Sequence, residues 1–259
     1  MEPVLHVPAF QDNYIWLIRG RNAPHKVAIV DPGDAAPVLA ALRAQKLTPV
    51  TILCTHHHRD HVGGVAELLA EYKVPVYGPA RERIAGVTHP LREGEHAVLP
   101  ELDLEFRVLD IPAHTAGHIA YYGNGLLFCG DTLFSAGCGR LFEGSAAQMA
   151  QSLETLAALP DDTAVYCGHE YTAANLRFAL TVEPDNAAAQ AHLAQVQTWR
   201  AGGRPSLPST IGLERRINQF LRTREAGVRA SAERHAGRTL VTPTEVFAAL
   251  RAWKDGFSG

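Results

Sequence analysis

Four side chains of the kinds that bind metal ions lie within six consecutive residues, at His56, His58, Asp60 and His61. The segment Thr55-His56-His57-His58-Arg59-Asp60-His61 follows an expected strand and precedes an expected helix. Because side chains two apart along an extended segment point the same way, His56 and His58 can face one ion while His57 points elsewhere. Asp60 and His61 lie where the chain turns into the helix, so they can face a second ion. The alternative, a solvated histidine-rich loop, is disfavoured because so many ligand types fall together.

Three further ligand candidates, His114, Asp131 and His169, each follow a hydrophobic strand that ends in Gly or Pro-Ala. Taken singly, each could be an ordinary core or surface residue. Together with the loop they make five histidines and two aspartates, too many for one tetrahedral zinc ion, which takes about four ligands. They suit two ions if one carboxylate bridges, and dividing the other six equally leaves Asp131 as the bridge. Imidazole favours zinc or iron, and the carboxylates widen the choice to manganese.

Other residues near these ligands have supporting roles. Cys54, Cys129 and Cys167 each lie two residues before a ligand, but we interpret them as small buried strand residues. Asp31 and His118 are better placed to hydrogen-bond the outer ring nitrogens of metal-bound histidines, which such ligands usually require.

The elements that must position these ligands are mostly strands over the first 170 residues or so. Short β-rich runs separated by turn residues predict strands at Val4–Phe10, Tyr14–Arg19, Lys26–Val30, Thr51–Cys54, Val74–Tyr77, Leu102–Ile111, Ile119–Tyr122, Leu126–Cys129 and Ala164–Cys167. Apolar residues at helical spacing predict two intervening helices, over about Gly63–Tyr72 and Ala146–Leu159. The second helix begins with a capping-box pattern, Ser145 with Gln148.

After Tyr171 the pattern becomes helical. Helices are expected over Asn186–Arg200 and Leu213–Arg222, and a last one begins at Thr242, with Pro243 at its first position and Glu245 at its third. We therefore place a domain boundary near residue 170.

Composition excludes several classes of protein. The chain has 259 residues, 46% of them hydrophobic and 20% charged, which is typical of a globular protein rather than a disordered one. Its apolar runs are too short to span a membrane. Four cysteines do not make a disulfide framework at this length, which fits a reducing compartment. The net charge of −3 does not favour nucleic-acid binding, although residues 200–259 alone carry a balance of +6.

The metal loop with the later His114, Asp131 and His169 resembles the metallo-β-lactamase superfamily. More narrowly, the chain resembles the glyoxalase II family of hydroxyacylglutathione hydrolases over nearly its whole length. The metal loop is specific for the superfamily only, and the helical C-terminal part with its Arg-x-x-Lys ending singles out the family. The motifs that carry the narrower resemblance are Asp12-Asn13-Tyr14, Gly137-Cys138-Gly139-Arg140, Cys167-Gly168-His169-Glu170-Tyr171, Glu183-Pro184-Asp185-Asn186, Pro208-Ser209 and Arg251-Ala252-Trp253-Lys254.

The resemblance implies an α/β (α+β) fold, a four-layer αβ/βα sandwich with a C-terminal helical domain. Residues 1–170 would be the catalytic domain and residues 171–259 the substrate-binding domain. By motif, one metal would be held by His56, His58 and His114, the other by Asp60, His61 and His169, with Asp131 bridging. Glutathione would be contacted by Arg140, Phe142, Tyr171, Arg251 and Lys254. Phe142 stands where the family often has Tyr, Arg140 where some members have Lys, and Gln219 where the family often has Pro.

The resemblance further implies a thioester hydrolase that cleaves S-(2-hydroxyacyl)glutathione, notably S-D-lactoylglutathione, in the second step of methylglyoxal detoxification. Two divalent ions, most often zinc with iron or manganese as alternatives, would lower the pKa of a bridging water towards about 7. That hydroxide would attack the thioester carbonyl, with Asp60 and Asp131 as catalytic metal ligands. The departing thiolate, whose free-thiol pKa is about 8.5, needs no strong general acid. We expect a cytoplasmic monomer whose partner is a small molecule, not a membrane or nucleic acid.

Three alternatives remain open at this point. A glutathione-persulfide dioxygenase of the same superfamily would use a single iron. A nucleic-acid-processing hydrolase with this fold would use two zinc ions, but would carry more positive charge and an added binding domain. A non-catalytic metal or glutathione binding module is disfavoured because a purely structural site closes its coordination.

Overall fold

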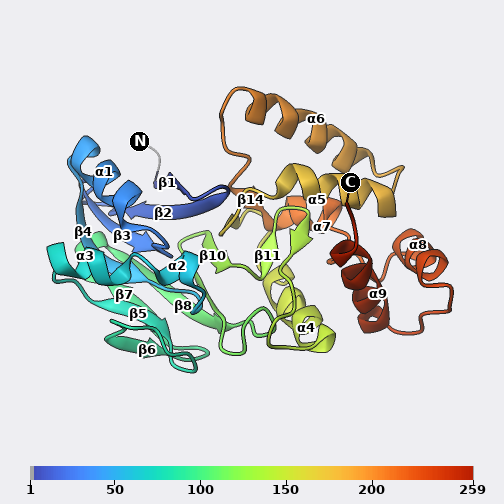
Figure 1. Ribbon diagram of the computed structural model, residues 1–259, viewed down its shortest axis with the longest axis horizontal. Coiled ribbons are helices and arrows are strands. Elements are labelled where there is room, and N and C mark those ends of the chain that lie inside the picture. Colours follow the sequence, from blue (N-terminus) through green and yellow to red (C-terminus); the bar gives the residue numbers. More distant parts are fainter. Residues whose placement is uncertain (1–2, 259) are drawn as a thin grey trace. The chain divides into compact units, whose positions relative to one another are not determined.

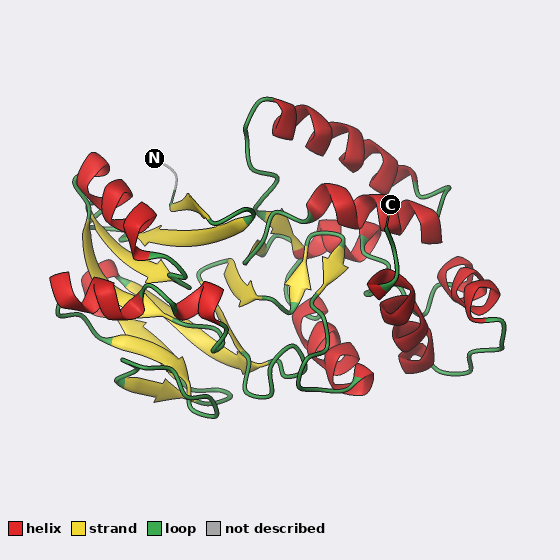
Figure 2. Ribbon diagram, viewed as in Figure 1, coloured by secondary structure: helices red, strands yellow, loops and turns green. Residues whose placement is uncertain are grey.

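The computed structural model describes residues 3–258 and divides into two compact units. Unit 1 contains the chain up to Asp110 together with Thr115–Gly130, and unit 2 contains Ile111–His114 together with the chain from Asp131 onward. Figure 1 follows the chain through both units, and Figure 2 distinguishes strands from helices. The mixed α/β class with C-terminal helices, expected from the sequence, is confirmed.

The first sheet of unit 1 has the strand order β1-β2-β3-β4-β5-β6. These strands are β1 (Val4–Ala9), β2 (Asn13–Arg19), β3 (Lys26–Val30), β4 (Thr48–Leu53), β5 (Val76–Pro79) and β6 (His89–Leu91). The first three strands pair antiparallel and the last four pair parallel. The first five lie within a few residues of the predicted runs. The short β6 was missed, since its sequence His89-Pro90-Leu91 carries no alternating apolar pattern.

Three helices pack on this sheet, one before the metal loop, one at its end and one after it. They are α1 (Ala35–Gln45), α2 (Arg59–Val62) and α3 (Val65–Glu71). Val38, Leu39 and Leu42 of α1 pack in one core with Val65 and Leu68 of α3 and with apolar residues of the strands. The sequence reading missed α1, although Asp34 caps it and its apolar residues have helical spacing.

The second group of strands in unit 1 is antiparallel, in the order β10-β9-β8-β7. It contains β7 (His96–Leu99), β8 (Leu104–Asp110), β9 (Ile119–Gly123) and β10 (Leu126–Gly130). Leu102 was predicted to begin β8 but ends a 3₁₀ turn, η1 (Pro100–Leu102), because Asp103 adopts a left-handed φ of 55°. Asn124 and Gly125 connect β9 to β10 with φ values of 57° and 75°, the geometry of a tight two-residue hairpin.

Unit 2 is mainly helical. Its helices are α4 (Ala146–Ala157), α5 (Thr172–Val182), α6 (Ala187–Ala201), α7 (Ile211–Ile217), α8 (Ala226–Ala236) and α9 (Pro243–Asp255), and its strands are β11 (Leu133–Phe134), β12 (Gly137–Cys138), β13 (Ala164–Cys167) and β14 (Ser209–Thr210). Helices α5, α6 and α7 share a small core that includes Leu176, Val196 and Ile217. Both predicted capping boxes are present, at Ser145 and Thr242.

The predicted helix Leu213–Arg222 was too long. Helix α7 ends at Ile217 because Asn218 takes an extended conformation and uses its side chain to bind main-chain oxygens of Phe134 and Gly137. Helices α5 and α8 were not predicted individually. The boundary near residue 170 remains a prediction, since the two compact units divide the chain at other residues. Among residues 3–258, no helix combines the length and apolarity that crossing a membrane requires.

Candidate metal centre

The metal loop of unit 1 starts directly after β4. His56 is fully buried and His61 is 1% exposed, and their ring centroids lie 4.2 Å apart. His58 is the N-cap of α2, with extended backbone angles, and its ring centroid lies 4.8 Å from that of His56. The expected turn into a helix before Asp60 is therefore confirmed, whereas the segment before it is not extended throughout, since the chain bends at Thr55 and His56.

Asp31 orients two residues of this loop. Its Oδ1 accepts a hydrogen bond from the Thr55 main-chain nitrogen at 2.7 Å, and its Oδ2 accepts one from Thr55 Oγ1 at 2.7 Å. The same Oδ2 lies 3.1 Å from Nδ1 of His61. Because Nδ1 of His61 faces this carboxylate, Nε2 is the nitrogen left to face a metal. Asp31 thus makes the contact with a ligand ring nitrogen that the sequence predicted.

Asp60 is held from the start of β2. Nδ2 of Asn13 donates to the Asp60 main-chain oxygen at 3.3 Å and to its Oδ2 at 3.0 Å. Nε2 of His61 lies 3.6 Å from the same Oδ2. The side chain of Asp60 is 43% exposed. The two side chains expected to share one metal ion therefore lie next to each other in unit 1.

His118 lies flat against His56. The two rings stack with centroids 4.4 Å apart and planes inclined by 16°. Nδ1 of His118 lies 3.1 Å from the Ile119 main-chain oxygen. His118 therefore contacts the ligand candidate His56 through ring stacking, while a hydrogen bond to a ligand ring nitrogen stays a prediction.

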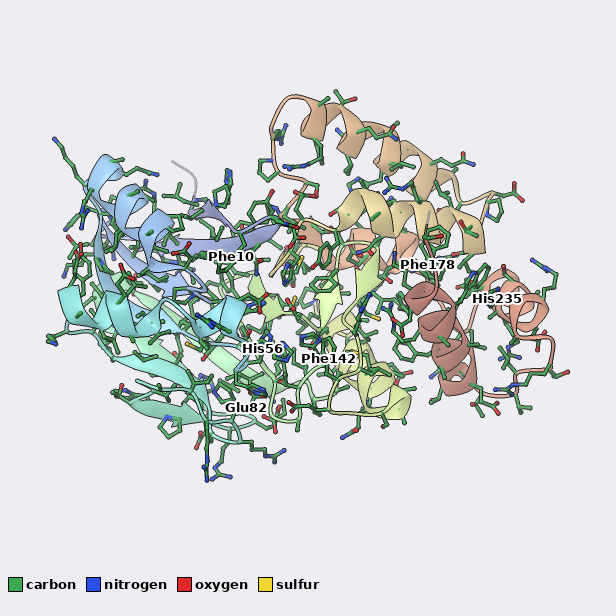
Figure 3. The ribbon with its side chains drawn as sticks, viewed as in Figure 1. Phe10, His56, Glu82, Phe142, Phe178 and His235 are labelled. Carbon is green, nitrogen blue, oxygen red and sulfur yellow. The ribbon has the colours of Figure 1, made fainter. Side chains whose placement is uncertain are left out.

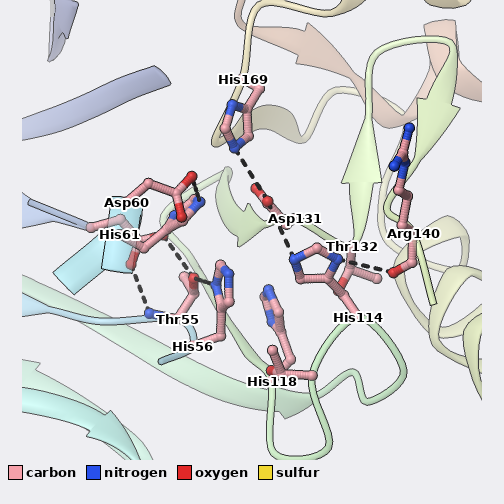
Figure 4. A network of polar contacts seen from close by, with 12 residues as sticks. Thr55, His56, Asp60, His61, His114, His118, Asp131, Thr132, Arg140 and His169 are labelled. Atoms are coloured by element: carbon pink, nitrogen blue, oxygen red, sulfur yellow. Dashed lines mark hydrogen bonds and ion pairs between the residues drawn. The ribbon is translucent and has the colours of Figure 1, made fainter. Parts of the chain in front are cut away.

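In unit 2, two imidazoles converge on a single carboxylate oxygen. Nε2 of His114 lies 3.4 Å and Nε2 of His169 lies 3.2 Å from Oδ2 of Asp131 (Figure 4). The three side chains are 5 to 8% exposed. The sequence predicts that these two histidines bind different ions and that Asp131 bridges the ions. One carboxylate oxygen within reach of both imidazoles is the donor arrangement that a bridging ligand requires.

The two imidazoles of unit 2 have defined orientations. Nδ1 of His114 lies 3.0 Å from the Arg140 main-chain oxygen, which leaves Nε2 toward Asp131. The His169 ring stacks on Tyr171, with centroids 4.7 Å apart and planes inclined by 5°, and meets Phe134 edge-on at 5.8 Å.

The segment that runs from Asp131 to Arg140 is anchored by buried polar groups. A Cβ at Gly139 would lie 1.9 Å from the Asp131 main-chain oxygen, so only glycine fits there. Glu214, fully buried on α7, accepts a hydrogen bond from the Ala136 main-chain nitrogen at 2.7 Å and one from Ser209 Oγ. Burial raises the pKa of the Glu214 carboxyl, and these hydrogen bonds oppose the rise. The sequence reading missed Glu214, because nothing local marks an acid whose partners are far along the chain.

The cysteines are buried thiols, which supports the structural interpretation. Burial raises the pKa of Cys54 well above its ordinary value and that of Cys167 to about 12. Cys129 is also fully buried. At neutral pH buried thiols of this kind remain protonated, whereas a metal ligand must be a thiolate.

The expected substrate residues lie in unit 2 with different exposures. Phe142 is 61% exposed and contacts His114 edge-on at 5.2 Å, and the Arg140 side chain is 69% exposed. Nζ of Lys254 lies 5.4 Å from the centre of the Phe178 ring. Burial, followed by the positive charges of Arg251, Arg177 and Arg140, lowers the pKa of Lys254. These cations gather at the end of α9, as a site for a carboxylate would require.

Arg251 differs from these residues, since it is only 5% exposed. Its Nη1 donates to the Cys138 main-chain oxygen at 2.9 Å, and its Nη2 to Asp255 Oδ1 at 2.8 Å. Its guanidinium also lies over the Phe220 ring, 5.3 Å from the centroid. Arg251 therefore joins α9 to β12 within unit 2, a role that helical spacing alone does not reveal.

Comparison with known proteins identifies the family. The model described as "Metallo-beta-lactamase superfamily" matches residues 10–169, and the one described as "Hydroxyacylglutathione hydrolase C-terminus" matches residues 170–257. The chain belongs to the hydroxyacylglutathione hydrolase family. It is 53% identical to the hydroxyacylglutathione hydrolase of Nitrosomonas europaea, over 99% of this chain and 97% of that protein. It is 57% identical to that of Alkalilimnicola ehrlichii, over 98% of this chain and 99% of the relative.

Solved structures support the fold of this family member. ETHE1 from Myxococcus xanthus matches with a TM-score of 0.62 and 26% identity, over 95% of this chain and 98% of that one. TTHA1623 in a di-iron-bound form matches with a TM-score of 0.59 and 28% identity, over 85% of this chain and 100% of that one. The metallo-β-lactamase fold expected from the sequence is thus confirmed. Membership in the hydrolase family also leaves the single-iron dioxygenase alternative less supported than the hydrolase.

Proposed function

We propose that this protein hydrolyses S-(2-hydroxyacyl)glutathione thioesters, notably S-D-lactoylglutathione, to glutathione and a 2-hydroxy acid. The single observation that carries this proposal is the convergence of His114 and His169 on one oxygen of Asp131. In a chain of the hydroxyacylglutathione hydrolase family, that arrangement supports a two-metal thioesterase. The reaction would be the second step of methylglyoxal detoxification.

The proposed ligand sets follow the motifs. His56, His58 and His114 would bind one ion, Asp60, His61 and His169 the other, and Asp131 would bridge them. The donors are neutral imidazoles and carboxylates, a set that accepts zinc, iron and manganese, with zinc favoured. The orientation of two of these rings fits metal binding, since Nδ1 of both His61 and His114 is engaged by an oxygen atom.

Two bound divalent ions would supply a water-derived nucleophile at neutral pH and would polarise the thioester carbonyl. The residues of the chain supply positioning. Asn13 holds the carboxylate of Asp60, and Asp31 holds the ring of His61. Asp60 and Asp131 are the carboxylates that we propose take part in catalysis. No strong general acid is required, because the thiol that leaves has a pKa of about 8.5.

Recognition of glutathione would fall to the cationic end of unit 2. Lys254 and Arg140 would attract its carboxylates, while Tyr171 and Phe142 would line the path of the peptide. Phe142 lacks the hydroxyl of the Tyr often found in the family, so it would offer only its ring. Arg251 would contribute charge from its buried position and hold Asp255 away from the substrate.

Recognition of the glutathione part of the substrate is tested with two thioesters. The protein would be given S-D-lactoylglutathione and the S-D-lactoyl thioester of N-acetylcysteamine, which has the same acyl group but no charged groups. We expect kcat/KM at least about 100-fold higher for the glutathione thioester, since losing two charge-assisted contacts costs about 3 kcal/mol or more. Equal values would contradict recognition of glutathione.

We also propose that the protein acts in the cytoplasm as a monomer, with a small molecule as its partner. Its four buried thiols fit a reducing compartment. Light scattering in solution tests the monomer, for which about 28 kDa is the expected mass.

A further inference from the structure

His57 lies in the middle of the metal loop, yet the proposed ligand sets do not use it. Its Nδ1 lies 3.0 Å from Oε2 of Glu82, which follows β5. Figure 3 labels Glu82 and His56, which come from different segments of unit 1. Because His56 and His58 are the direct chain neighbours of His57, holding the His57 ring restrains the backbone that carries both ligands.

The carboxylate of Glu82 also holds a second segment. Its Oε1 accepts a hydrogen bond from Thr115 Oγ1 and one from the Gly117 main-chain nitrogen at 3.0 Å. The side chain of Glu82 is only 3% exposed. Thr115 directly follows the proposed ligand His114 in the sequence. A nearly buried carboxylate is tolerated only where hydrogen-bond donors surround it. The Glu82 carboxylate therefore favours a fold in which the metal loop and the segment after His114 both lie against it.

The packing around Glu82 leaves little space. A Cβ at Gly117 would lie 2.6 Å from Cγ of Glu82 and 2.9 Å from Cβ of Arg81. The turn therefore needs glycine to bring its main-chain nitrogen to the carboxylate. This close contact between Gly117 and Glu82 favours one position of the Glu82 carboxylate, and therefore one position of the His57 ring.

We propose that Glu82 is a positioning residue that acts through His57 to hold the metal loop in its ligand-binding shape. It touches neither metal nor substrate. The inference rests on the proposed function only in that it takes His56 and His58 as metal ligands. Partners behind metal ligands commonly change metal affinity or activity about 10- to 100-fold when they are removed.

Unit 1 contains a second pair of the same residue types that serves as a control. His96 on β7 pairs with Glu105 on β8, but their side chains are 47% and 57% exposed. That pair lies on strands away from the metal loop in the sequence. Glu105→Gln therefore makes the same chemical change as Glu82→Gln without touching the loop.

The test compares the rate at which metal-loaded protein releases its ions to a chelator. The variants are Glu82→Gln, His57→Ala, the double variant, His57→Asn and Glu105→Gln. We expect metal release about 10-fold faster in Glu82→Gln and in His57→Ala, since either change frees the backbone that positions His56 and His58. The double variant should be no faster than the faster single one, because both changes break one link. His57→Asn, which keeps a donor toward Glu82, should recover part of the loss.

Two results would overturn the inference: release at the wild-type rate in both single variants, or effects that multiply in the double variant. If Glu82→Gln fails to fold, His57→Ala and His57→Asn decide the matter alone. Thermal unfolding of the metal-free proteins is measured alongside. A lowered melting temperature with unchanged release would assign Glu82 a purely structural role and reject the inference. Because no thioester is used, metal-loaded protein that fails to hydrolyse S-D-lactoylglutathione contradicts the proposed function but not this inference.

Discussion

Nη1 of Arg251 donates a hydrogen bond to the main-chain oxygen of Cys138, 2.9 Å away, and so joins α9 to β12. Cys138 lies two residues before Arg140, which the sequence assigns to glutathione binding. The buried guanidinium of Arg251 and its less buried neighbours therefore belong to one cationic cluster, but we expect them to have different roles. Arg251 joins the two elements that carry the cluster, and we propose that Lys254 contacts the carboxylate of the substrate.

Replacing Arg251 should affect stability as well as binding. Arg251→Ala removes hydrogen bonds from a buried charged group, which should lower the free energy of unfolding by about 2–3 kcal/mol. It should also raise KM for the glutathione thioester. Lys254→Ala should raise KM about 10-fold and lower the free energy of unfolding by about 1 kcal/mol or less, because the side chain is only partly buried. Urea unfolding and steady-state kinetics check both variants. Equal stability losses in the two would contradict this division of roles.

The pH dependence of KM should report the state of Lys254. Burial and the neighbouring charges of Arg251, Arg177 and Arg140 lower its pKa below the ordinary value of 10.5. The ammonium attracts a carboxylate only while protonated, so KM should rise as the pH increases through this lowered pKa. Lys254→Arg should move the rise to higher pH, because guanidinium stays charged. A KM that rises at the same pH in the wild type and in Lys254→Arg would exclude Lys254 from binding.

Acidification should destabilise unit 2 through His192. The ring lies on α6 and burial lowers its pKa below 6.5, so the folded protein keeps it neutral. In the unfolded chain the same ring gains a proton near pH 6.5. The stability contribution is thus present above about pH 6.5 and is lost as the pH falls below it. His192→Leu should lessen the fall in unfolding free energy between pH 7.5 and 5.5, measured with urea. Identical pH slopes in the two proteins would reject this account.

Gln219 should reduce stability. Its side chain is fully buried, and neither its Nε2 nor its Oε1 has a hydrogen-bond partner within residues 3–258. A buried polar group that lacks a partner costs about 1–3 kcal/mol. Gln219→Met, which keeps the length of the side chain, should raise the free energy of unfolding by about 1–2 kcal/mol in urea titrations. A variant less stable than wild type would mean that the amide is satisfied in solution.

The sequence predicted most of what depends on local spacing. His56 and His58 could be recognised as a pair because an extended segment repeats every two residues. The capping boxes at Ser145 and Thr242 were also predictable, because the residues that form each box lie within one turn of helix.

What the sequence did not predict depends on contacts between distant segments. Glu82 lies 25 residues from His57 and 33 from Thr115, so no local pattern marks it. The burial of Arg251 follows from a partner 113 residues away. Helical spacing predicts that Arg251 and Lys254 share a face, but the contact with β12 makes Arg251 the more buried of the two.

The central claim is most directly tested by counting metal ions and measuring hydrolysis of S-D-lactoylglutathione on the same sample, for the wild type and Asp131→Asn. The account predicts two ions per wild-type chain with rapid hydrolysis. In Asp131→Asn it predicts loss of at least one ion and a fall in kcat of about 100-fold or more, since the bridging carboxylate is gone. Hydrolysis by a wild-type chain with one ion or none, or an Asp131→Asn variant with both ions and full activity, would contradict it.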